Sequence, residues 1–367
     1  MLAVAAAVQA QPPQTADQLF DTGLAEFNAK SYEKCAATFS RVVAMSSQNY
    51  TAYYNQGLCY YNLERYADAV TAFQSSIRIK PDYARAHVQL GNAYDYLDRY
   101  NEAIAAYMKA LEYEPNNANA LFELGVAHYR QKNYQASIGT FQKSIAADPK
   151  NPDTHYRLAL DYINLKQSDA AEASLKKAID LGIQNGYAQY ELGKIYSDRK
   201  NPQLAIQYLQ SAIRYKPDLA AAQRTLGDEY VETKEYDKAI PYYREAIRLS
   251  PDYAEAYLGL GNAFYNRDLW TDSIAPYKKA TEISPKYTQA HLFLADAYLN
   301  SKQNTLAIAS YKKAVELEPK NSEGYYGLGL AYYNLKNKRM ANENYIVLKA
   351  LDPEKAAKLL TYINKLP

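Results

Sequence analysis

A repeat of 34 residues runs through this chain and constrains its fold more than any other feature. A small residue recurs at that spacing in ten consecutive units, from residue 16 to residue 355, without an insertion or a deletion. It is glycine in eight units and alanine in two: Gly23, Gly57, Gly91, Gly125, Ala159, Gly193, Gly227, Gly261, Ala295 and Gly329. A fixed period of about 20–50 residues is typical of proteins built from stacked supersecondary units. We number each unit from 1 to 34, which gives this small residue position 8.

Other positions also keep their character from unit to unit. Position 20 is always small: Cys35, Ala69, Ala103, Ser137, Ala171, Ala205, Ala239, Ser273, Ala307 and Ala341. Position 24 is aromatic or leucine: Phe39, Phe73, Tyr107, Phe141, Leu175, Leu209, Tyr243, Tyr277, Tyr311 and Tyr345. Position 32 is proline in eight units: Pro81, Pro115, Pro149, Pro217, Pro251, Pro285, Pro319 and Pro353. Position 11 is tyrosine in seven units, which explains part of the unusual total of 39 tyrosines.

These positions have a mechanical meaning. The small residues at positions 8 and 20 lie on two successive segments with apolar residues at helical spacing, so two antiparallel helices can approach closely. Large residues at positions 11 and 24 fill the space beside them, and proline at position 32 ends the second helix. Each unit is therefore predicted to be a helical hairpin. Because one hairpin cannot bury its apolar face alone, the hairpins must stack into an all-α solenoid.

The pattern of Leu-Gly, Tyr, Ala, Phe or Tyr, Ala and Pro resembles the tetratricopeptide repeat (TPR) family. One complete example consists of Leu90, Gly91, Tyr94, Ala103, Tyr107, Ala110 and Pro115. The resemblance implies a right-handed superhelix in which the first helix of each hairpin lines a concave groove. Position 4 departs from the family's tryptophan, which loosens the packing without challenging the fold.

The repeat divides the chain into three parts. Ten units are predicted at 16–49, 50–83, 84–117, 118–151, 152–185, 186–219, 220–253, 254–287, 288–321 and 322–355. Residues 356–367 are predicted to form a capping helix, because Leu359, Leu360 and Ile363 make an apolar stripe. Between the fifth and sixth units, the loop with Gly182 and Gly186 lacks the usual proline. That loop is either a weak seam or an inert variant.

Residues 1–15 form an apolar N-terminal segment. The small residues before Gln11 look like the end of a signal peptide, although no Lys or Arg precedes the apolar run. The segment is either such a signal or a donor tail that inserts into an apolar surface. Export to the cell envelope or the extracellular space is favoured slightly over a cytoplasmic location. No run reaches the roughly 18 apolar residues of a membrane span.

No catalytic or metal-binding pattern emerges. The four histidines, His87, His128, His155 and His291, occupy repeat positions 4 and 11 and are interpreted as packing residues. Serine-nucleophile motifs, glycine-rich phosphate loops and paired zinc-ligand cysteines are missing. Cys35 and Cys59 are interpreted as two buried thiols, with one bridge between them as the alternative. We expect a protein that is not an enzyme and needs no cofactor or metal.

The predicted groove is mainly apolar. The resemblance places positions 5, 9 and 12 on the concave wall, and 22 of these 30 residues are aliphatic or aromatic. The candidate binding residues are Phe20, Leu24, Phe27, Tyr54, Leu58, Tyr61, Phe122, Val126, Tyr129, Tyr156, Leu160, Tyr326, Leu330 and Tyr333. Units 6 and 7 interrupt the wall with Lys194, Ser197, Arg224 and Asp228. The alternative is that these apolar residues only pack between adjacent first helices.

Two other readings of the groove depend on polar residues. The family's clamp for acidic tails needs a cation at position 5, where only Arg224 is cationic, so acidic tails are disfavoured. Position 13 is asparagine in six units: Asn28, Asn62, Asn164, Asn266, Asn300 and Asn334. These amides either form a ladder that grips a peptide backbone or terminate the first helices.

Two functions remain. The first is a scaffold that binds apolar or aromatic protein segments along its groove. The second is a structural protein that assembles head to tail into a filament or ring, through the solenoid ends and the N-terminal segment. A net charge of only +2 and the lack of a basic stripe argue against nucleic acid as a partner.

Overall fold

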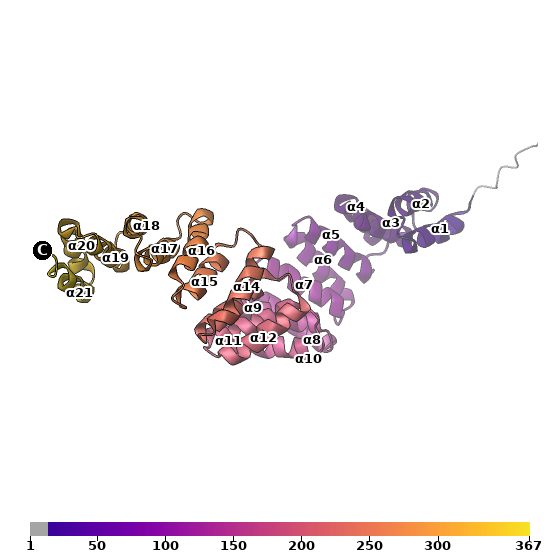
Figure 1. Cartoon of the computed structure of the whole chain (residues 1–367). Coiled ribbons are helices and arrows are strands. Elements are labelled where there is room, and N and C mark those ends of the chain that lie inside the picture. Colours follow the sequence, from indigo (N-terminus) through magenta and orange to yellow (C-terminus); the bar gives the residue numbers. More distant parts are fainter. Residues whose placement is uncertain (1–13) are drawn as a thin grey trace, which may run out of the picture. The chain divides into compact units, whose positions relative to one another are not determined.

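The computed structural model describes residues 14–367, and within this range every regular element is a helix. Figure 1 shows the 21 helices of this range as successive hairpins followed by one extra helix. The expected all-α solenoid fold is therefore confirmed. The predicted signal or donor tail falls almost entirely on residues 1–13, which lie outside the described residues.

The chain divides into two compact units, of which the first ends at Ile183 and the second begins at Gln184. The first unit contains α1 (Ala16–Asn28), α2 (Tyr32–Met45), α3 (Tyr50–Asn62), α4 (Tyr66–Ile79), α5 (Ala84–Tyr96), α6 (Tyr100–Tyr113), α7 (Ala118–Arg130), α8 (Tyr134–Ala147), α9 (Pro152–Asn164) and α10 (Ser168–Asp180). The second contains α11 (Gly186–Asp198), α12 (Pro202–Tyr215), α13 (Ala220–Glu232), α14 (Tyr236–Leu249), α15 (Ala254–Tyr265), α16 (Trp270–Ile283), α17 (Thr288–Asn300), α18 (Asn304–Leu317), α19 (Ser322–Asn334), α20 (Lys338–Leu351) and α21 (Pro353–Ile363).

The boundary between the two units falls in the loop that lacks the usual proline. Here α10 ends at Asp180, one residue earlier in its unit than the other second helices, and Gly182 adopts a left-handed backbone with φ of 88°. Asn185 then caps α11 by accepting a hydrogen bond from the Ala188 amide at 2.9 Å. The loop that the sequence marks as a seam or a variant is thus the place where one compact unit ends.

The turn inside each hairpin uses a left-handed residue at position 15. All ten are non-glycine residues with φ between 57° and 64°: Lys30, Glu64, Asp98, Lys132, Lys166, Lys200, Lys234, Asp268, Lys302 and Lys336. In the first hairpin the Lys30 and Ser31 amides donate to the carbonyls of Phe27 and Glu26 at 2.9 and 2.8 Å. These bonds satisfy carbonyls that the end of a helix leaves free. The sequence does not reveal this conformation, because glycine is the residue that normally marks it.

Neighbouring hairpins meet where position 20 of one approaches position 10 of the next. At the first such junction Cys35 of α2 and Cys59 of α3 are fully buried and form a disulfide, with their Cα atoms 6.0 Å apart. The interpretation of these residues as two separate thiols is therefore wrong, and the alternative bridge is present. At the equivalent junction in the fourth hairpin, Ser137 donates a hydrogen bond of 2.7 Å to the buried Asp161 carboxylate. The junction accepts such pairs because small residues let the two helices approach closely.

The capping helix differs from the predicted range of 356–367. Helix α21 begins three residues earlier, at Pro353, and ends at Ile363. Asp352 caps it by accepting from the Lys355 amide at 3.0 Å, and proline suits the first helical position because it has no amide hydrogen to leave unpaired. Leu359 and Ile363 are buried against the last hairpin, as the apolar stripe predicts. Leu360 is only partly buried.

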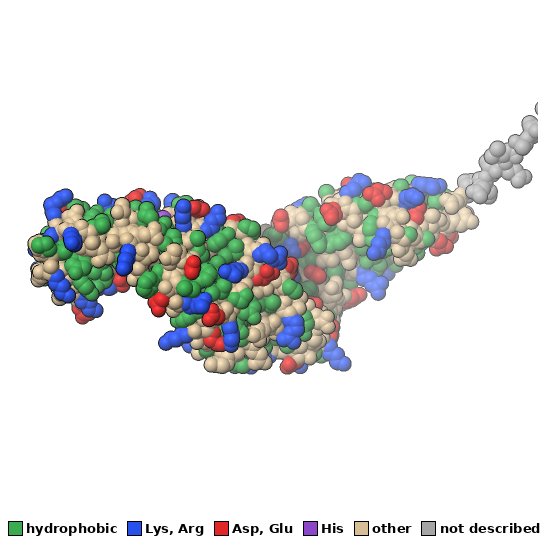
Figure 2. Space-filling model, in the orientation of Figure 1, with side chains coloured by type: hydrophobic (Ala, Val, Ile, Leu, Met, Phe, Trp, Pro, Cys, Tyr) green, Lys and Arg blue, Asp and Glu red, His purple; other side chains and the backbone are tan. Residues whose placement is uncertain are grey.

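Surface charge is mixed on the face of the molecule shown in Figure 2, where blue and red side chains lie interspersed among green ones. Among residues 14–367, no helix has the length and apolar character that crossing a membrane requires.

Candidate interaction groove

The predicted groove residues lie on the first helices of their hairpins, and all but Val126 are partly exposed. Their inner atoms pack against the core: Phe20 and Leu24 contact the cluster around Phe39, and Tyr326 and Leu330 contact the cluster around Tyr311. Each of these side chains thus contributes to packing and also presents apolar surface. The binding role of these residues stays a prediction.

Behind this surface, positions 9 and 24 of each hairpin form what we call its groove pair. The glycine at position 8 brings them together, because a Cβ atom added to Gly57 would lie only 2.5 Å from the Phe73 ring. The ring at position 24 therefore rests directly on the backbone of the first helix. This close contact accounts for the glycine at position 8 of eight hairpins, and the other two hairpins hold the smallest side chain, in Ala159 and Ala295.

The two members of a groove pair match chemically. Wherever a buried tyrosine stands at position 24, its hydroxyl donates to the polar residue at position 9 of the same hairpin. The pairs are Tyr107 to Asn92 at 2.7 Å, Tyr243 to Asp228 at 2.7 Å, Tyr277 to Asn262 at 2.8 Å, and Tyr311 to Asp296. Where position 24 is Phe or Leu, position 9 is usually apolar, as in Leu24/Phe39, Leu58/Phe73, Val126/Phe141 and Leu160/Leu175. A buried hydroxyl needs a hydrogen-bond partner and a buried phenyl ring does not, which accounts for this matching.

Two groove pairs depart from the rule. The sixth hairpin combines Lys194 with Leu209, and Lys194 is held by Glu191 at 3.0 Å. The last hairpin combines Leu330 with Tyr345, which is only partly buried. There, Leu359 of α21 fills the space beside Gly329 that position 24 fills elsewhere. The capping helix thus changes the packing of the last hairpin.

A cavity of about 390 Å³ opens among α15, α17 and α19 in the second unit. Most of its lining comes from first-helix positions 2, 5, 6, 9 and 12, and Tyr311 adds its ring from α18. The lining residues are Tyr265, Gln289, Leu292, Phe293, Asp296, Leu299, Tyr311, Glu323, Tyr326, Gly327 and Leu330. Gly327 is required here, because an added Cβ would lie 2.2 Å from the Tyr311 ring. The cavity is therefore largely apolar and aromatic, with two carboxylates.

Two aspartates occupy position 9 in the second unit, and only one of them has a cationic neighbour. Asp228 forms an ion pair of 2.5 Å with Arg224, one helical turn earlier, and burial nevertheless raises its pKa. Asp296 has Leu292 at the corresponding place. Burial, opposed by the Tyr311 hydrogen bond and assisted by Glu323, raises the pKa of Asp296 to about 6. Sequence reasoning named Asp228 and missed Asp296, although both stand at position 9.

The first unit holds a smaller and more polar depression. It has a volume of about 360 Å³ and is lined by Tyr54, Arg85, Val88, Gln89, Asn117 and Asn119. A cluster of three tyrosines lies nearby in the sequence: Tyr61, Tyr66 and Tyr96, with the Tyr66 and Tyr96 rings stacked at 4.7 Å. Tyr96 is 56% exposed and stands at position 13, where six other units have asparagine. The tyrosine in place of asparagine at position 13 marks this cluster of exposed aromatic residues in the sequence, and sequence reasoning missed it.

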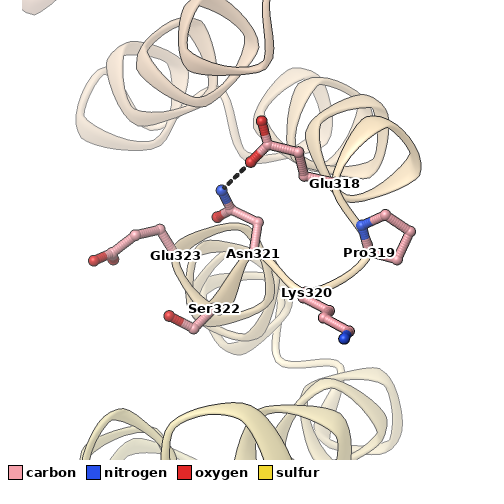
Figure 3. A pocket seen from close by; sticks show the side chains of 6 residues that line it. All are labelled: Glu318, Pro319, Lys320, Asn321, Ser322 and Glu323. Carbon is pink, nitrogen blue, oxygen red and sulfur yellow. Dashed lines mark hydrogen bonds between the residues drawn. The ribbon is translucent and has the colours of Figure 1, made fainter.

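Another depression belongs to a loop between hairpins. It has a volume of about 680 Å³ and is lined by residues 318–323, between α18 and α19. Figure 3 shows that the Glu318 carboxylate accepts a hydrogen bond from the Asn321 amide, at 3.1 Å. Asn321 also caps α19. These contacts explain the loop without any ligand.

The six position-13 asparagines are all exposed; five are the last residue of a first helix, and Asn266 directly follows the last residue of α15. Four of them donate to the backbone carbonyl one turn earlier: Asn62, Asn164, Asn266 and Asn300, at 2.8 to 2.9 Å. Asn164 and Asn300 also reach the hydroxyls of Tyr129 and Tyr265 on the preceding first helix, at 3.4 and 2.7 Å. The backbone bonds lie at the ends of the first helices, and the two tyrosine bonds join neighbouring hairpins. A peptide-binding role of these amides stays a prediction.

The histidines at position 4 make local contacts. His87 and His291 bond the carbonyls of Pro81 and Pro285 through Nε2, at 2.8 and 3.0 Å. Gln223, at the same position, bonds the Pro217 carbonyl at 3.3 Å. Across residues 14–367, no group of three His, Cys, Asp or Glu side chains is arranged to hold a metal ion.

Comparison with known proteins agrees with the repeat. Models described as Tetratricopeptide repeat match residues 50–83, 88–152 and 156–220, and a model described as TPR repeat matches 227–268 and 295–336. The matched segments together make up more than half of the sequence. None of the curated proteins compared matches the chain.

Two solved structures with TM-scores of 0.50 or more show the same fold. The C-terminal part of a TPR repeat-containing protein from Cytophaga hutchinsonii is 22% identical, with a TM-score of 0.55 over 65% of this chain and 99% of that one. Pseudomonas aeruginosa pilF is 18% identical, with a TM-score of 0.50 over 58% and 98%. Yeast Tom70 is 16% identical and covers 95% of this chain and 88% of its own, at a TM-score of 0.42. The repeat models and the hairpin geometry together confirm the resemblance expected from the sequence, and the chain belongs to the tetratricopeptide repeat family.

Proposed function

We propose that this protein is a non-catalytic scaffold that binds apolar or aromatic segments of other proteins along the first helices of its hairpins. Proteins built from TPR repeats generally serve as protein interaction scaffolds. One observation carries the proposal for this chain: the cavity of about 390 Å³ is lined mainly by first-helix positions, including 5, 9 and 12. Largely apolar concavities with a few placed polar groups are the usual form of a binding site.

The partly exposed aromatic residues supply further support. Tyr54 lines the depression of the first unit, and Tyr326 lines the cavity of the second. Aromatic side chains bury a large area at a small loss of side-chain entropy, which makes them effective contacts in interfaces. Each compact unit thus has a concave surface of its own with a tyrosine from position 5.

Selection from a displayed library of random peptides would test this function on the full chain. We expect the selection to enrich apolar or aromatic peptides. Their affinity should fall in the double variant Tyr54→Ser, Leu58→Ser, in the double variant Tyr326→Ser, Leu330→Ser, or in both variants. The matched control is Met108→Ser with Tyr215→Ser, which removes exposed apolar residues from the second helices α6 and α12. Thermal denaturation followed by circular dichroism would verify that each variant folds.

Two results would contradict the proposal. Either no peptide is enriched over an unrelated carrier protein, or the enriched peptides bind the groove variants and the control variant equally well.

Head-to-tail assembly stays a prediction without a supporting contact. Helix α21 buries Ala356, Leu359 and Ile363 against the last hairpin, on which a further hairpin would otherwise stack. Its capping role therefore favours the scaffold, and sedimentation of the purified chain would reveal a filament or ring directly.

A further inference from the structure

The cavity among α15, α17 and α19 contains a carboxylate without a cation. Asp296 lines the cavity and accepts a hydrogen bond from the Tyr311 hydroxyl. None of the lining residues is Lys or Arg, and among residues 14–367 no ion pair joins Asp296 to a basic side chain. With a pKa of about 6, the carboxylate is mostly ionised at neutral pH. A partly buried charge of this kind is stabilised by any cation that can reach it.

The seventh hairpin shows how such a carboxylate is neutralised in this chain. Asp228 has the same position and the same tyrosine partner as Asp296, and it is bound by the Arg224 guanidinium at 2.5 Å. The guanidinium carbon also lies 6.0 Å from the centroid of the Tyr253 ring. In the ninth hairpin Leu292 replaces the arginine, so the chain itself supplies no cation there.

The walls of the cavity suit a guanidinium group. Tyr265 on α15, Phe293 on α17 and Tyr326 on α19 bring three aromatic rings to it. A planar guanidinium can stack on such rings while it bonds a carboxylate through two N–H groups, whereas the lysine ammonium is a compact point charge that prefers water.

A second carboxylate lines the cavity, and unlike Asp296 it has a cationic partner in the part of the chain that the structure describes. Glu323 lines it and is bound by Lys355 at 2.9 Å, a lysine that Asp352 also holds at 2.9 Å. Figure 3 shows the Glu323 side chain pointing away from Lys320, the basic residue of the neighbouring loop. A segment with an acidic residue at this place would meet the Asp296 carboxylate, which has no cationic partner among residues 14–367, and would be repelled.

We propose that this cavity receives an arginine side chain of the bound protein segment, held by Asp296 and enclosed by the aromatic rings of α15, α17 and α19. The inference rests on the proposed scaffold function, since a segment lying in the groove must carry the arginine. It gives that segment a defined chemistry: an arginine flanked by apolar or aromatic residues.

Short capped peptides would test the subsite on the full chain. The first carries a central arginine between leucine and phenylalanine residues, the second has citrulline at the centre, and the third has glutamate. Citrulline keeps the shape of arginine without its charge. We expect fluorescence anisotropy to show that the arginine peptide binds about tenfold more tightly than the citrulline peptide, a difference of about 1.4 kcal/mol. We expect the glutamate peptide to bind most weakly.

Asp296→Asn should remove the preference for arginine over citrulline. The variant keeps the fold, because Tyr311 can donate to an asparagine oxygen as Tyr277 donates to Asn262 at 2.8 Å in the preceding hairpin. Asp228→Asn is the matched control and should leave the preference unchanged, because Arg224 already neutralises Asp228.

The inference is overturned if the wild-type chain binds the arginine and citrulline peptides equally or binds neither. It is also overturned if the preference survives Asp296→Asn. Self-association of the chain that Asp296→Asn abolishes would assign the cavity to a second copy instead. Library selection that yields peptides without arginine, bound in the groove, would leave the proposed scaffold function standing and remove only this subsite.

Discussion

The two compact units build their groove pairs from different chemistry. In residues 14–183 four of five pairs are apolar, such as Leu58 with Phe73, and only Tyr107 with Asn92 is hydrogen-bonded. In residues 184–367 three of five pairs join a tyrosine hydroxyl to Asn or Asp. The backbone of the hairpin is the same in both units. The difference shows that one repeat geometry accepts either an apolar or a hydrogen-bonded pair, provided that both members change together.

The largest expected effect follows from breaking an apolar pair in the first unit. Leu58→Asp would place a carboxylate beside Phe73, which has no hydroxyl to donate. We expect the free energy of unfolding to fall by about 3 kcal/mol, because the partly buried carboxylate loses water contacts and gains neither a hydrogen-bond donor nor a cation. Urea denaturation followed by circular dichroism would measure this loss.

Two variants check the cause of that loss. Ala67→Asp adds the same charge at an exposed site near the N-terminus of α4 and should leave stability nearly unchanged. Phe73→Tyr added to Leu58→Asp should restore part of the loss, because it recreates the pairing found in the second unit. Equal losses of stability from Leu58→Asp and Ala67→Asp would show that the chemical match within the groove pair is not the cause.

The next effect distinguishes the two aspartate pairs of the second unit. Tyr311→Phe would remove the hydrogen bond to Asp296 and should cost about 2 kcal/mol, the usual range for a bond to a charged group. Tyr243→Phe should cost about 1 kcal/mol or less, because Arg224 still binds Asp228. Urea denaturation measures both losses of stability. A larger loss for Tyr243→Phe than for Tyr311→Phe would show that Arg224 does not compensate for the missing hydrogen bond to Asp228.

A double-mutant cycle measures the matching within one pair. Asn262→Leu and Tyr277→Phe each leave one polar group without its partner, while the double variant resembles Leu58 with Phe73 in the first unit. We expect a coupling energy of about 1 kcal/mol between the two changes. Simple additivity of the single changes would mean that the hydrogen bond of 2.8 Å does not determine the match.

The smallest effect concerns the buried acid of the first unit, which lies in a junction and not in a groove pair. Asp161 is fully buried, one of its oxygens lacks a partner, and burial raises its pKa from 3.8 to about 7. Because the folded state holds the proton more tightly than the unfolded state, the cost to stability grows as the pH rises from about 4 to about 7 and is complete above that.

Asp161→Ala removes this cost and leaves the Ser137 hydroxyl with an acceptor, because its one hydrogen can turn to the Gly125 carbonyl at 2.9 Å. We expect a gain under about 1 kcal/mol at pH 8, because lost side-chain contacts offset most of the benefit, and a loss of stability at pH 4.5, where the acid is protonated and little charge cost is left to remove. Thermal denaturation at the two pH values would measure it. A gain independent of pH would show that the carboxylate charge is not the cause.

Much of the hairpin architecture is predictable from the sequence for a definite reason. A helix-helix contact restricts residue size, so the small residues at positions 8 and 20 and the large ones at position 24 record it directly. The matching of groove pairs is also visible once positions 9 and 24 are compared. The start of α21 cannot be read from the sequence, because Pro353 can follow the end of one helix or begin the next. Only the cap formed by Asp352 shows that α21 begins at Pro353.

The candidate site was less predictable. Apolar residues at positions 5, 9 and 12 indicate a wall, but residue types do not reveal which carboxylate lines a cavity. Asp228 and Asp296 differ in the structure because Arg224 reaches one of them and Leu292 stands at the corresponding place beside the other. Positions 5 and 9 are neighbours on one helix, so this difference is readable from the sequence, whereas the cavity that Asp296 lines is visible only in the structure.

The sequence alone determined the family, the ten hairpins and their apolar interior, because these depend on a residue pattern that recurs in each 34-residue unit. The tertiary structure decided which residues of different hairpins meet: the disulfide between Cys35 and Cys59, the division after Ile183, and the cavity around Asp296. The residue pattern of one unit reflects the contacts within its hairpin. Contacts between hairpins depend on how closely helices of neighbouring units approach, and the sequence of one unit does not determine that distance.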